Sequence, residues 1–167
     1  REIGRNVPKR PMTAKDFEAF VREHQDMVYT TALRMLARPV EAEDAAQEVF
    51  VKAFERYSDL REAVNPGGWL RTVTTNLCLN HLERHRGRWR LFSEMENGEA
   101  IEAGLVAPET DPDAQDRRTI LEEALLKLTD AQRVPLVLFH FEDMSYEDIA
   151  RRLGTSLGKV KTDIHRG

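Results

Sequence analysis

The sequence contains a single cysteine, Cys78, so no disulfide can form within the chain. No group of cysteines and histidines has the spacing of a metal site, which argues against structural zinc. The longest nearly unbroken apolar run, residues 134–139, is far shorter than the roughly 20 residues that a membrane-spanning helix needs. The first dozen residues also lack the apolar segment of a secretory signal. We therefore expect a protein of the reducing cytoplasm, with no metal and no membrane insertion of its own.

Recognisable catalytic patterns are missing as well. The sequence has no glycine-rich phosphate loop and no nucleophile elbow. Its five histidines are scattered and show no partner pattern for catalysis. We expect a protein that is not an enzyme and that carries no cofactor.

The net charge of −4 hides two neighbouring blocks of opposite sign. Residues 69–92 contain five arginines and one acidic residue, whereas residues 94–116 contain eight acidic residues and no lysine or arginine. Such blocks indicate segments that meet oppositely charged surroundings, although a solvated helix face would give the same arginine cluster. Glycines and prolines within the acidic block are typical of a linker.

Helical periodicity dominates the chain, and no segment of five or more residues alternates as a strand would. The pattern predicts an all-α fold. Thr13 has the character of an N-cap for a first helix that ends before Pro39, and a second helix is predicted at about 42–57. Asn65 and Pro66 can cap and open a third helix.

The last 25 residues predict two short helices joined by a tight turn. Ser145 can cap a helix over residues 146–153, Gly154 can adopt the left-handed conformation that ends it, and Ser156 can cap a helix that starts at Leu157. This is the pattern of a helix-turn-helix, and its second helix presents donors that could reach phosphates and base edges. A purely structural helical hairpin is the alternative at this point.

Three stretches, in this order, resemble the extracytoplasmic-function (ECF) group of the sigma-70 family of transcription initiation factors. The stretch D-A-A-Q-E-V-F-V-K-A-F at 44–54 resembles region 2.2, and W-L-R-T-V-T-T-N-L-C-L-N-H-L-E-R at 69–84 resembles regions 2.3 and 2.4. Residues 128–166, which include M-S-Y-E-D-I-A-R-R-L-G-T-S-L-G-K-V-K-T, resemble region 4. Three motifs in the family order are far more specific than any one of them.

The resemblance implies two small helical domains joined by a flexible acidic linker. The expected divisions are an N-terminal tail at 1–12 that lacks order, a region 2 domain at 13–92, the linker at 93–112 and a region 4 helix-turn-helix domain at 113–167. In the family, the acidic linker threads toward the active-site cleft of the polymerase, where the growing transcript displaces it.

The resemblance also implies the function. A sigma factor binds core RNA polymerase and directs promoter-specific initiation by recognising the −10 and −35 elements. The implied partners are the coiled coil of the β′ subunit, the β flap, promoter DNA and an anti-sigma factor. The alternative is a helix-turn-helix regulator that binds duplex operator DNA independently of core polymerase.

Site residues follow by match to the family motifs. For core polymerase they are Asp44, Gln47, Glu48 and Phe50. For the melted −10 strand the first candidate is Asn76, followed by Arg71, Thr72, Asn80, Arg84 and Arg86. For the −35 duplex they are Ser156, Lys159, Lys161, Thr162, His165 and Arg166.

Two departures from the family pattern stand out. Asp163 occupies a position where many relatives have a basic residue, so it either reads a cytosine amino group or faces away from the phosphates. The chain starts at Arg1 rather than Met and stops at Gly167, where relatives continue the helix. We expect an incomplete chain, with Met12 as a candidate natural start.

Overall fold

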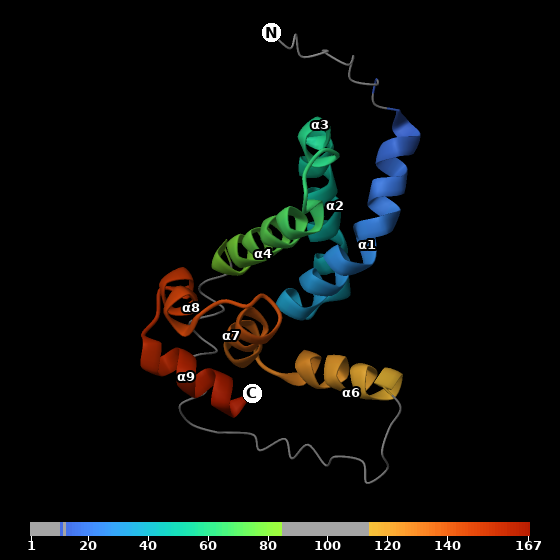
Figure 1. The fold of residues 1–167 in the computed structure, drawn as a ribbon. Helices are drawn as coiled ribbons and strands as arrows, with labels where there is room; N and C mark the ends of the chain where they lie inside the picture. The colour runs from blue at the N-terminus through green and yellow to red at the C-terminus, as the bar shows by residue number, and fades with distance from the viewer. Residues whose placement is uncertain (1–10, 12, 85–113) are drawn as a thin grey trace.

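The computed structural model describes residues 11, 13–84 and 114–167, and within these ranges every regular element is a helix (Figure 1). The predicted all-α fold is therefore confirmed. The expectations for the N-terminal tail, the acidic linker and Arg86 lie outside the described residues.

Helix α1 (Ala14–Leu36) begins as its N-terminal sequence predicts. The Thr13 hydroxyl accepts a hydrogen bond from the backbone N–H of Asp16 (3.3 Å), and the Asp16 carboxylate accepts one from the backbone N–H of Thr13 (3.1 Å). This reciprocal pair satisfies two donors that the first helical turn leaves free. The helix ends where Ala37 adopts a left-handed conformation (φ 56°), two residues before Pro39, so the predicted stop is confirmed.

Helix α2 (Pro39–Glu55) begins three residues earlier than predicted. Pro39 is its first residue, because proline has no N–H to lose at that position and its fixed φ suits a helix. A separate short helix, α3 (Tyr57–Leu60), follows α2, and the sequence analysis did not predict it. Helix α4 (Pro66–Arg84) opens at Pro66 as predicted, and the Asn65 side chain accepts a hydrogen bond from the N–H of Gly68 (2.9 Å).

The first four helices form a bundle in which α1 packs along α2 and α4 (Figure 1). Phe20 and Val28 of α1, Val49 of α2 and Leu70 of α4 are buried together in its core. The buried Tyr57 at the start of α3 donates a hydrogen bond to the carbonyl of Asp16 (3.0 Å). Short α3 is thereby fixed against the start of α1.

Within residues 114–167, the C-terminal half, the structure shows four helices: α6 (Ala114–Lys127), α7 (Asp130–His140), α8 (Tyr146–Leu153) and α9 (Leu157–Arg166). Figure 1 shows this half gathered beside the C-terminal end of α1. One buried cluster joins the two halves, since it contains Met35 of α1 and Cys78 of α4 together with Val137 of α7, Ile149 of α8 and Val160 of α9. The two halves therefore share a core.

Candidate DNA-binding and polymerase-binding surfaces

An open groove of about 870 Å³ runs between α1 and α2. Its walls are mostly apolar and aromatic, with Phe17, Val21 and Tyr29 on the α1 side and Phe50 and Phe54 on the α2 side. The rings of Phe17 and Phe54 meet edge to face, with 5.0 Å between centroids. A groove of this shape and composition suits an amphipathic helix of a partner protein.

The residues predicted for core polymerase lie in or beside this groove. Gln47 and Phe50 line it. Asp44 and Glu48 are exposed, and because they precede Val51 by seven and three residues they share its side of α2. The groove thus combines an apolar floor with an acidic flank.

Two large apolar side chains at the groove are not among the residues predicted from the sequence to bind polymerase. Val51 is 60% exposed and Phe54 is 51% exposed, and both line the groove. The apolar stripe of α2 is wider than the face it buries, so these two residues extend beyond the core. A stripe wider than one helix face in the sequence is the signal that could have identified them.

The residues predicted for the −10 element form a polar stripe on α4. Thr72, Asn76 and Asn80 are spaced by four residues, so they follow one another along one face of the helix. The Thr72 hydroxyl donates to the carbonyl of Gly68 (3.1 Å), which leaves its oxygen lone pairs as acceptors. The predicted residues that the structure describes here are all exposed: Arg71, Thr72, Asn76, Asn80 and Arg84.

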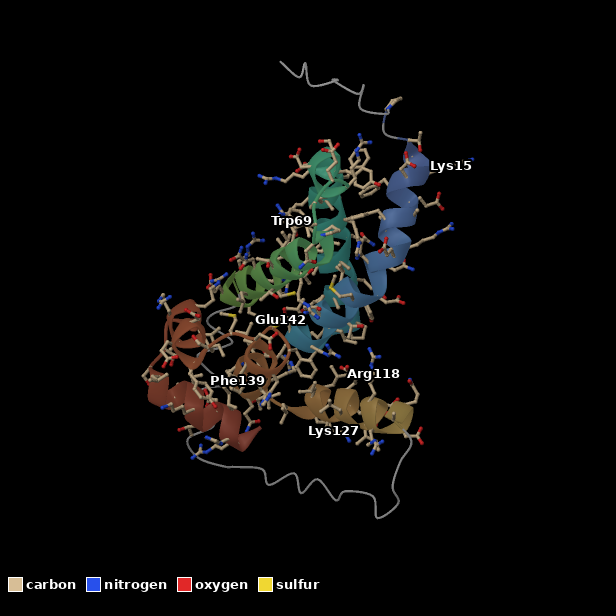
Figure 2. The ribbon with its side chains drawn as sticks, in the orientation of Figure 1. Lys15, Trp69, Arg118, Lys127, Phe139 and Glu142 are labelled. Carbon is tan, nitrogen blue, oxygen red and sulfur yellow. The ribbon has the colours of Figure 1, made fainter. Side chains whose placement is uncertain are left out.

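Trp69 lies at the first turn of α4, directly before this stripe, and is labelled in Figure 2. It is half-buried and packs against the core that α1, α2 and α4 share. The ring therefore packs against this core and supports the first turn of α4. This placement favours a packing role for Trp69.

Helices α8 and α9 form the predicted helix-turn-helix. Gly154 has φ 63°, the left-handed conformation that ends α8, and the N–H of Thr155 donates to the carbonyl of Ala150 (3.0 Å). Ala150 and Ile149 of α8 are buried, as is Val160 of α9. The small Ala150 side chain sits at the inner face of the pair, so the predicted helix, glycine turn and helix are confirmed.

The residues predicted for the −35 element lie on α9 or at its cap. The Ser156 hydroxyl caps the helix by accepting from the N–H of Lys159 (3.2 Å). The Lys161 ammonium lies 6.0 Å from the centroid of the Tyr146 ring, which orients it over α8. The exposed set is Ser156, Lys159, Lys161, Thr162, His165 and Arg166. A row of donors on a capped, exposed helix is what readout in the major groove requires.

Asp163 is paired within the same helix. The Lys159 ammonium donates to its carboxylate at 2.7 Å, and the Asp163 side chain is only 16% exposed. The carboxylate therefore neutralises one of the predicted phosphate-binding lysines.

Two of the predicted −10 residues touch the C-terminal half of the chain. Arg71 lies 3.8 Å from the carboxylate of Glu142, whose side chain is 8% exposed. Asn80 accepts a hydrogen bond from the guanidinium of Arg152 at 3.3 Å, and Arg152 also pairs with Glu83 at 3.0 Å. No pattern in the sequence predicts these contacts.

The surroundings of Glu142 shift two pKa values. Burial raises the pKa of Glu142 above its usual value, although the nearby guanidinium groups of Arg71 and Arg34 oppose the shift. Burial also raises the pKa of Cys78 to about 12, and the charge of Glu142 adds to that effect. The Cys78 thiol therefore stays protonated at neutral pH, which excludes a reactive thiolate.

No helix within residues 13–84 or 114–166 is both long and apolar enough to cross a bilayer.

Two sequence families match the chain. The family described as Sigma-70 region 2 matches residues 20–88, and the family described as Sigma-70, region 4 matches residues 118–167. The first match contains α4 and most of α1, and the second contains the helix-turn-helix.

Several characterised proteins are similar over most of the chain. The ECF RNA polymerase sigma factor SigE of Mycolicibacterium smegmatis is 36% identical over 90% of this chain, and the chain spans 58% of that protein's length. The ECF RNA polymerase sigma factor SigW of Bacillus subtilis is 30% identical over 90% of this chain and is itself 84% covered. A solved structure from Bartonella quintana contains the sigma factor RpoE in complex with the anti-sigma factor NepR. The matched chain is 26% identical to this one, the match covers 91% of each chain, and the TM-score is 0.45.

Proposed function

The chain belongs to the ECF group of the sigma-70 family of RNA polymerase sigma factors, and on this premise we propose that it binds core RNA polymerase and directs it to promoters. The observation that carries the proposal is the occurrence of both sigma regions in order, at 20–88 and 118–167, in one chain. A subunit that touches DNA through two separate modules can select a promoter by both its −10 and its −35 element.

We propose the groove between α1 and α2 as the docking site for core polymerase. Gln47 and Phe50 would contact a helical segment of the β′ coiled coil, and the flank of Asp44 and Glu48 would meet basic residues on it. Charge complementarity of this kind speeds association and excludes wrong partners, while the apolar contacts supply most of the affinity. The region 4 half would bind the β flap.

The polar stripe of α4 would hold the melted −10 strand. Extracting a base from the stack costs a few kcal/mol, which hydrogen bonds to its exposed edges must offset. Asn76 supports this role because its amide offers both a donor and an acceptor on an exposed face. Its neighbours Arg71, Thr72, Asn80, Arg84 and Arg86 would contact mainly phosphates and sugars.

The exposed face of α9 would read the −35 element as duplex. Lys161, Thr162, His165 and Arg166 would lie toward base edges and phosphates, with Ser156 and Lys159 close to the backbone at the helix N-terminus. Phosphate contacts fix the register of the helix, and contacts to base edges carry the sequence information.

We propose the cytoplasm as the location of the protein, because RNA polymerase acts there. It would work as a recognition subunit rather than as an enzyme, because polymerase supplies the chemistry. An anti-sigma factor that covers the polymerase-binding groove is the expected regulator.

DNase I footprinting with and without core polymerase tests the proposal. The chain mixed with core polymerase should protect a promoter fragment at both elements, whereas the chain alone should protect neither. Protection by the chain alone, unchanged when polymerase is added, would contradict the proposal and mark an independent duplex-binding regulator.

A further inference from the structure

Three side chains form a column across the helix-turn-helix and the helix before it. Phe139 of α7 and Tyr146 of α8 stack face to face, with 4.5 Å between ring centroids and 8° between ring planes. The ammonium of Lys161 of α9 lies over the Tyr146 ring, 6.0 Å from its centroid. Figure 2 shows Phe139 where the C-terminal helices come together. The column therefore joins one side chain from each of α7, α8 and α9.

The Tyr146 ring is held through its backbone and through one of its faces. Tyr146 is the first residue of α8 and follows Ser145, whose hydroxyl caps the helix by accepting from the N–H of Asp148 (3.1 Å). Tyr146 and Phe139 are both half-buried and pack against the buried cluster that contains Ile149. Parallel rings cover one face of each other, which leaves the second face of Tyr146 for a cation. The ring is therefore a fixed platform beside α9.

The two exposed lysines of α9 have partners of different kinds. Lys159 donates to the Asp163 carboxylate at 2.7 Å, so its charge is largely cancelled. Lys161 lies over an aromatic face, which attracts a cation through its quadrupole but carries no net charge. Lys161 therefore keeps its full positive charge, while the ring restricts where its ammonium lies.

The position of the ring determines which part of a DNA duplex Lys161 can reach. In a helix-turn-helix the first helix crosses the DNA backbone, and the second helix lies in the major groove. Tyr146 belongs to the first helix, so an ammonium drawn over its ring lies on the α8 side of α9. Phosphate oxygens are the acceptors on that side. A lysine side chain that is ordered beforehand also loses less conformational freedom when it binds.

We propose that Tyr146 is a positioning residue for recognition of the −35 element, and that it holds Lys161 for contact with a DNA phosphate. Lys161 supplies the charge, Tyr146 directs it, and Phe139 keeps the ring in place. The inference rests on the proposed function, since it takes α9 as the helix that reads the −35 duplex. The residues predicted from the sequence for this element lie on α9 or at its cap, so Tyr146 adds a residue of α8 to the site.

Substitutions of Tyr146 in the holoenzyme test the role of the ring. The probe is a duplex fragment carrying a promoter that the holoenzyme protects in the footprint, and fluorescence anisotropy gives the dissociation constant. Tyr146→Leu keeps apolar bulk but removes the aromatic face, so we expect roughly two- to fivefold weaker binding, the range for one exposed cation–π contact. Tyr146→Phe keeps the face and should bind as the wild type does. An equal loss for both variants would assign the effect to the hydroxyl and overturn the role of the ring.

A comparison of double variants separates positioning from packing. In a Lys161→Met background the loss caused by Tyr146→Leu should disappear, because no ammonium is left to position. In a Lys159→Met background the same loss should remain in full, since Lys159 pairs with Asp163 instead. The two backgrounds are matched, because each removes one exposed lysine of α9 by the same substitution. A loss that persists with Lys161→Met would show that Tyr146 acts only through folding of the helix pair, and would overturn the proposal.

The salt dependence of binding identifies what Lys161 contacts. Lys161→Met should reduce the slope of log Kd against log salt concentration by about one, as expected for one lost phosphate contact. An unchanged slope would place Lys161 away from the phosphates and overturn the assignment. The same fragment with a scrambled −35 element reads failure of the proposed function separately. Equal binding of the wild-type holoenzyme to the intact and scrambled fragments would contradict that function itself.

Discussion

At the scale of single residues, Asn76 is the side chain on which promoter opening should depend most. It is exposed on α4 and carries both a donor and an acceptor, so Asn76→Ala removes its hydrogen bonds to a base without disturbing the core. We expect the variant to lose about 1–3 kcal/mol of open-complex stability, the range for one good base contact. Permanganate footprinting of the melted strand measures this loss.

Binding to core polymerase serves as the internal control for Asn76→Ala, because Asn76 does not line the α1–α2 groove. The affinity of the variant for core polymerase should equal that of the wild type. Unchanged promoter opening at equal polymerase occupancy would reject the assignment of Asn76 to the base.

The sequence leaves two roles open for Asp163: it either reads a cytosine amino group or faces away from the phosphates. Substitution of this residue distinguishes them. Since Asp163 neutralises Lys159 at 2.7 Å, Asp163→Asn should release that lysine for a phosphate. The holoenzyme should then bind promoter DNA more tightly, and its affinity should fall more steeply with salt by about one counterion. Measurement of the dissociation constant over a salt series checks both effects.

Weaker binding by the Asp163→Asn holoenzyme, confined to promoters with cytosine at one −35 position, would contradict this account. Such a result would mean that Asp163 accepts a hydrogen bond from a cytosine amino group. The matched change Asp148→Asn, on an exposed residue of α8 paired with Arg151, removes the same charge outside α9 and should have a smaller effect.

At the scale of helices, the exposed rim of the α1–α2 groove should determine polymerase binding. Val51 is 60% exposed and lines the groove, so Val51→Asp places a charge where an apolar contact is expected. We expect a loss of core affinity of roughly tenfold or more, because the new charge would be buried without a partner against the apolar surface of the docked segment. Stability should change by no more than about 0.5 kcal/mol, because the side chain is outside the core.

Val40→Asp provides the matched control on the same helix. Val40 is 71% exposed and does not line the groove, so the same substitution there should leave core affinity unchanged. Equal losses for the two variants, or no loss for either, would place the docking site elsewhere.

Local signals in the sequence predicted the helix ends well. Thr13, Ser145 and Ser156 cap helices as predicted, because a cap depends on residues within one turn of itself. The start of α2 was placed at residue 42 rather than Pro39, because proline was interpreted as a helix stop and not also as a first residue. Helix α3 was missed, since four residues carry too little periodicity to be recognised.

The contacts between the two halves had no local signal. Arg34 and Glu122 are 88 positions apart, and the contact of Arg133 with the carbonyl of Arg34 spans 99 positions. Nothing in the sequence marked Arg133, which reads as an ordinary charged residue of an amphipathic helix. The family motifs assign residues to each surface, and the folded chain adds that Arg71 and Asn80 contact the C-terminal half.

At the scale of the whole molecule, Glu142 links stability to pH at the junction of the halves. Burial raises its pKa above the ordinary value of 4.5; Arg71 and Arg34 oppose the shift, and the adjacent Asp143 adds to it. The charge of this carboxylate adds to the burial that keeps the Cys78 thiol protonated at neutral pH. The folded chain therefore binds this proton more tightly than the unfolded chain, and the associated stability is lost as pH rises through the raised pKa.

Glu142→Gln should increase the free energy of unfolding at pH 7 relative to the wild type, because burial disfavours the ionised carboxylate and glutamine carries no charge. The difference should shrink as the pH falls below the ordinary value of 4.5, because the wild-type carboxyl then becomes protonated in both states. Urea denaturation at pH 7 and at a pH below 4.5 measures it, with the exposed Glu147→Gln as a control that should change little at either. A destabilised Glu142→Gln at pH 7 would show that attraction to Arg71 and Arg34 outweighs burial.

The most direct test of the whole account is transcription by core polymerase on a library of genomic fragments, with and without the chain, followed by sequencing of transcript 5′ ends. The account predicts start sites that depend on the chain and share two upstream motifs, one near −10 and one near −35. An identical set of start sites in both reactions, with the chain bound to the polymerase, would contradict it.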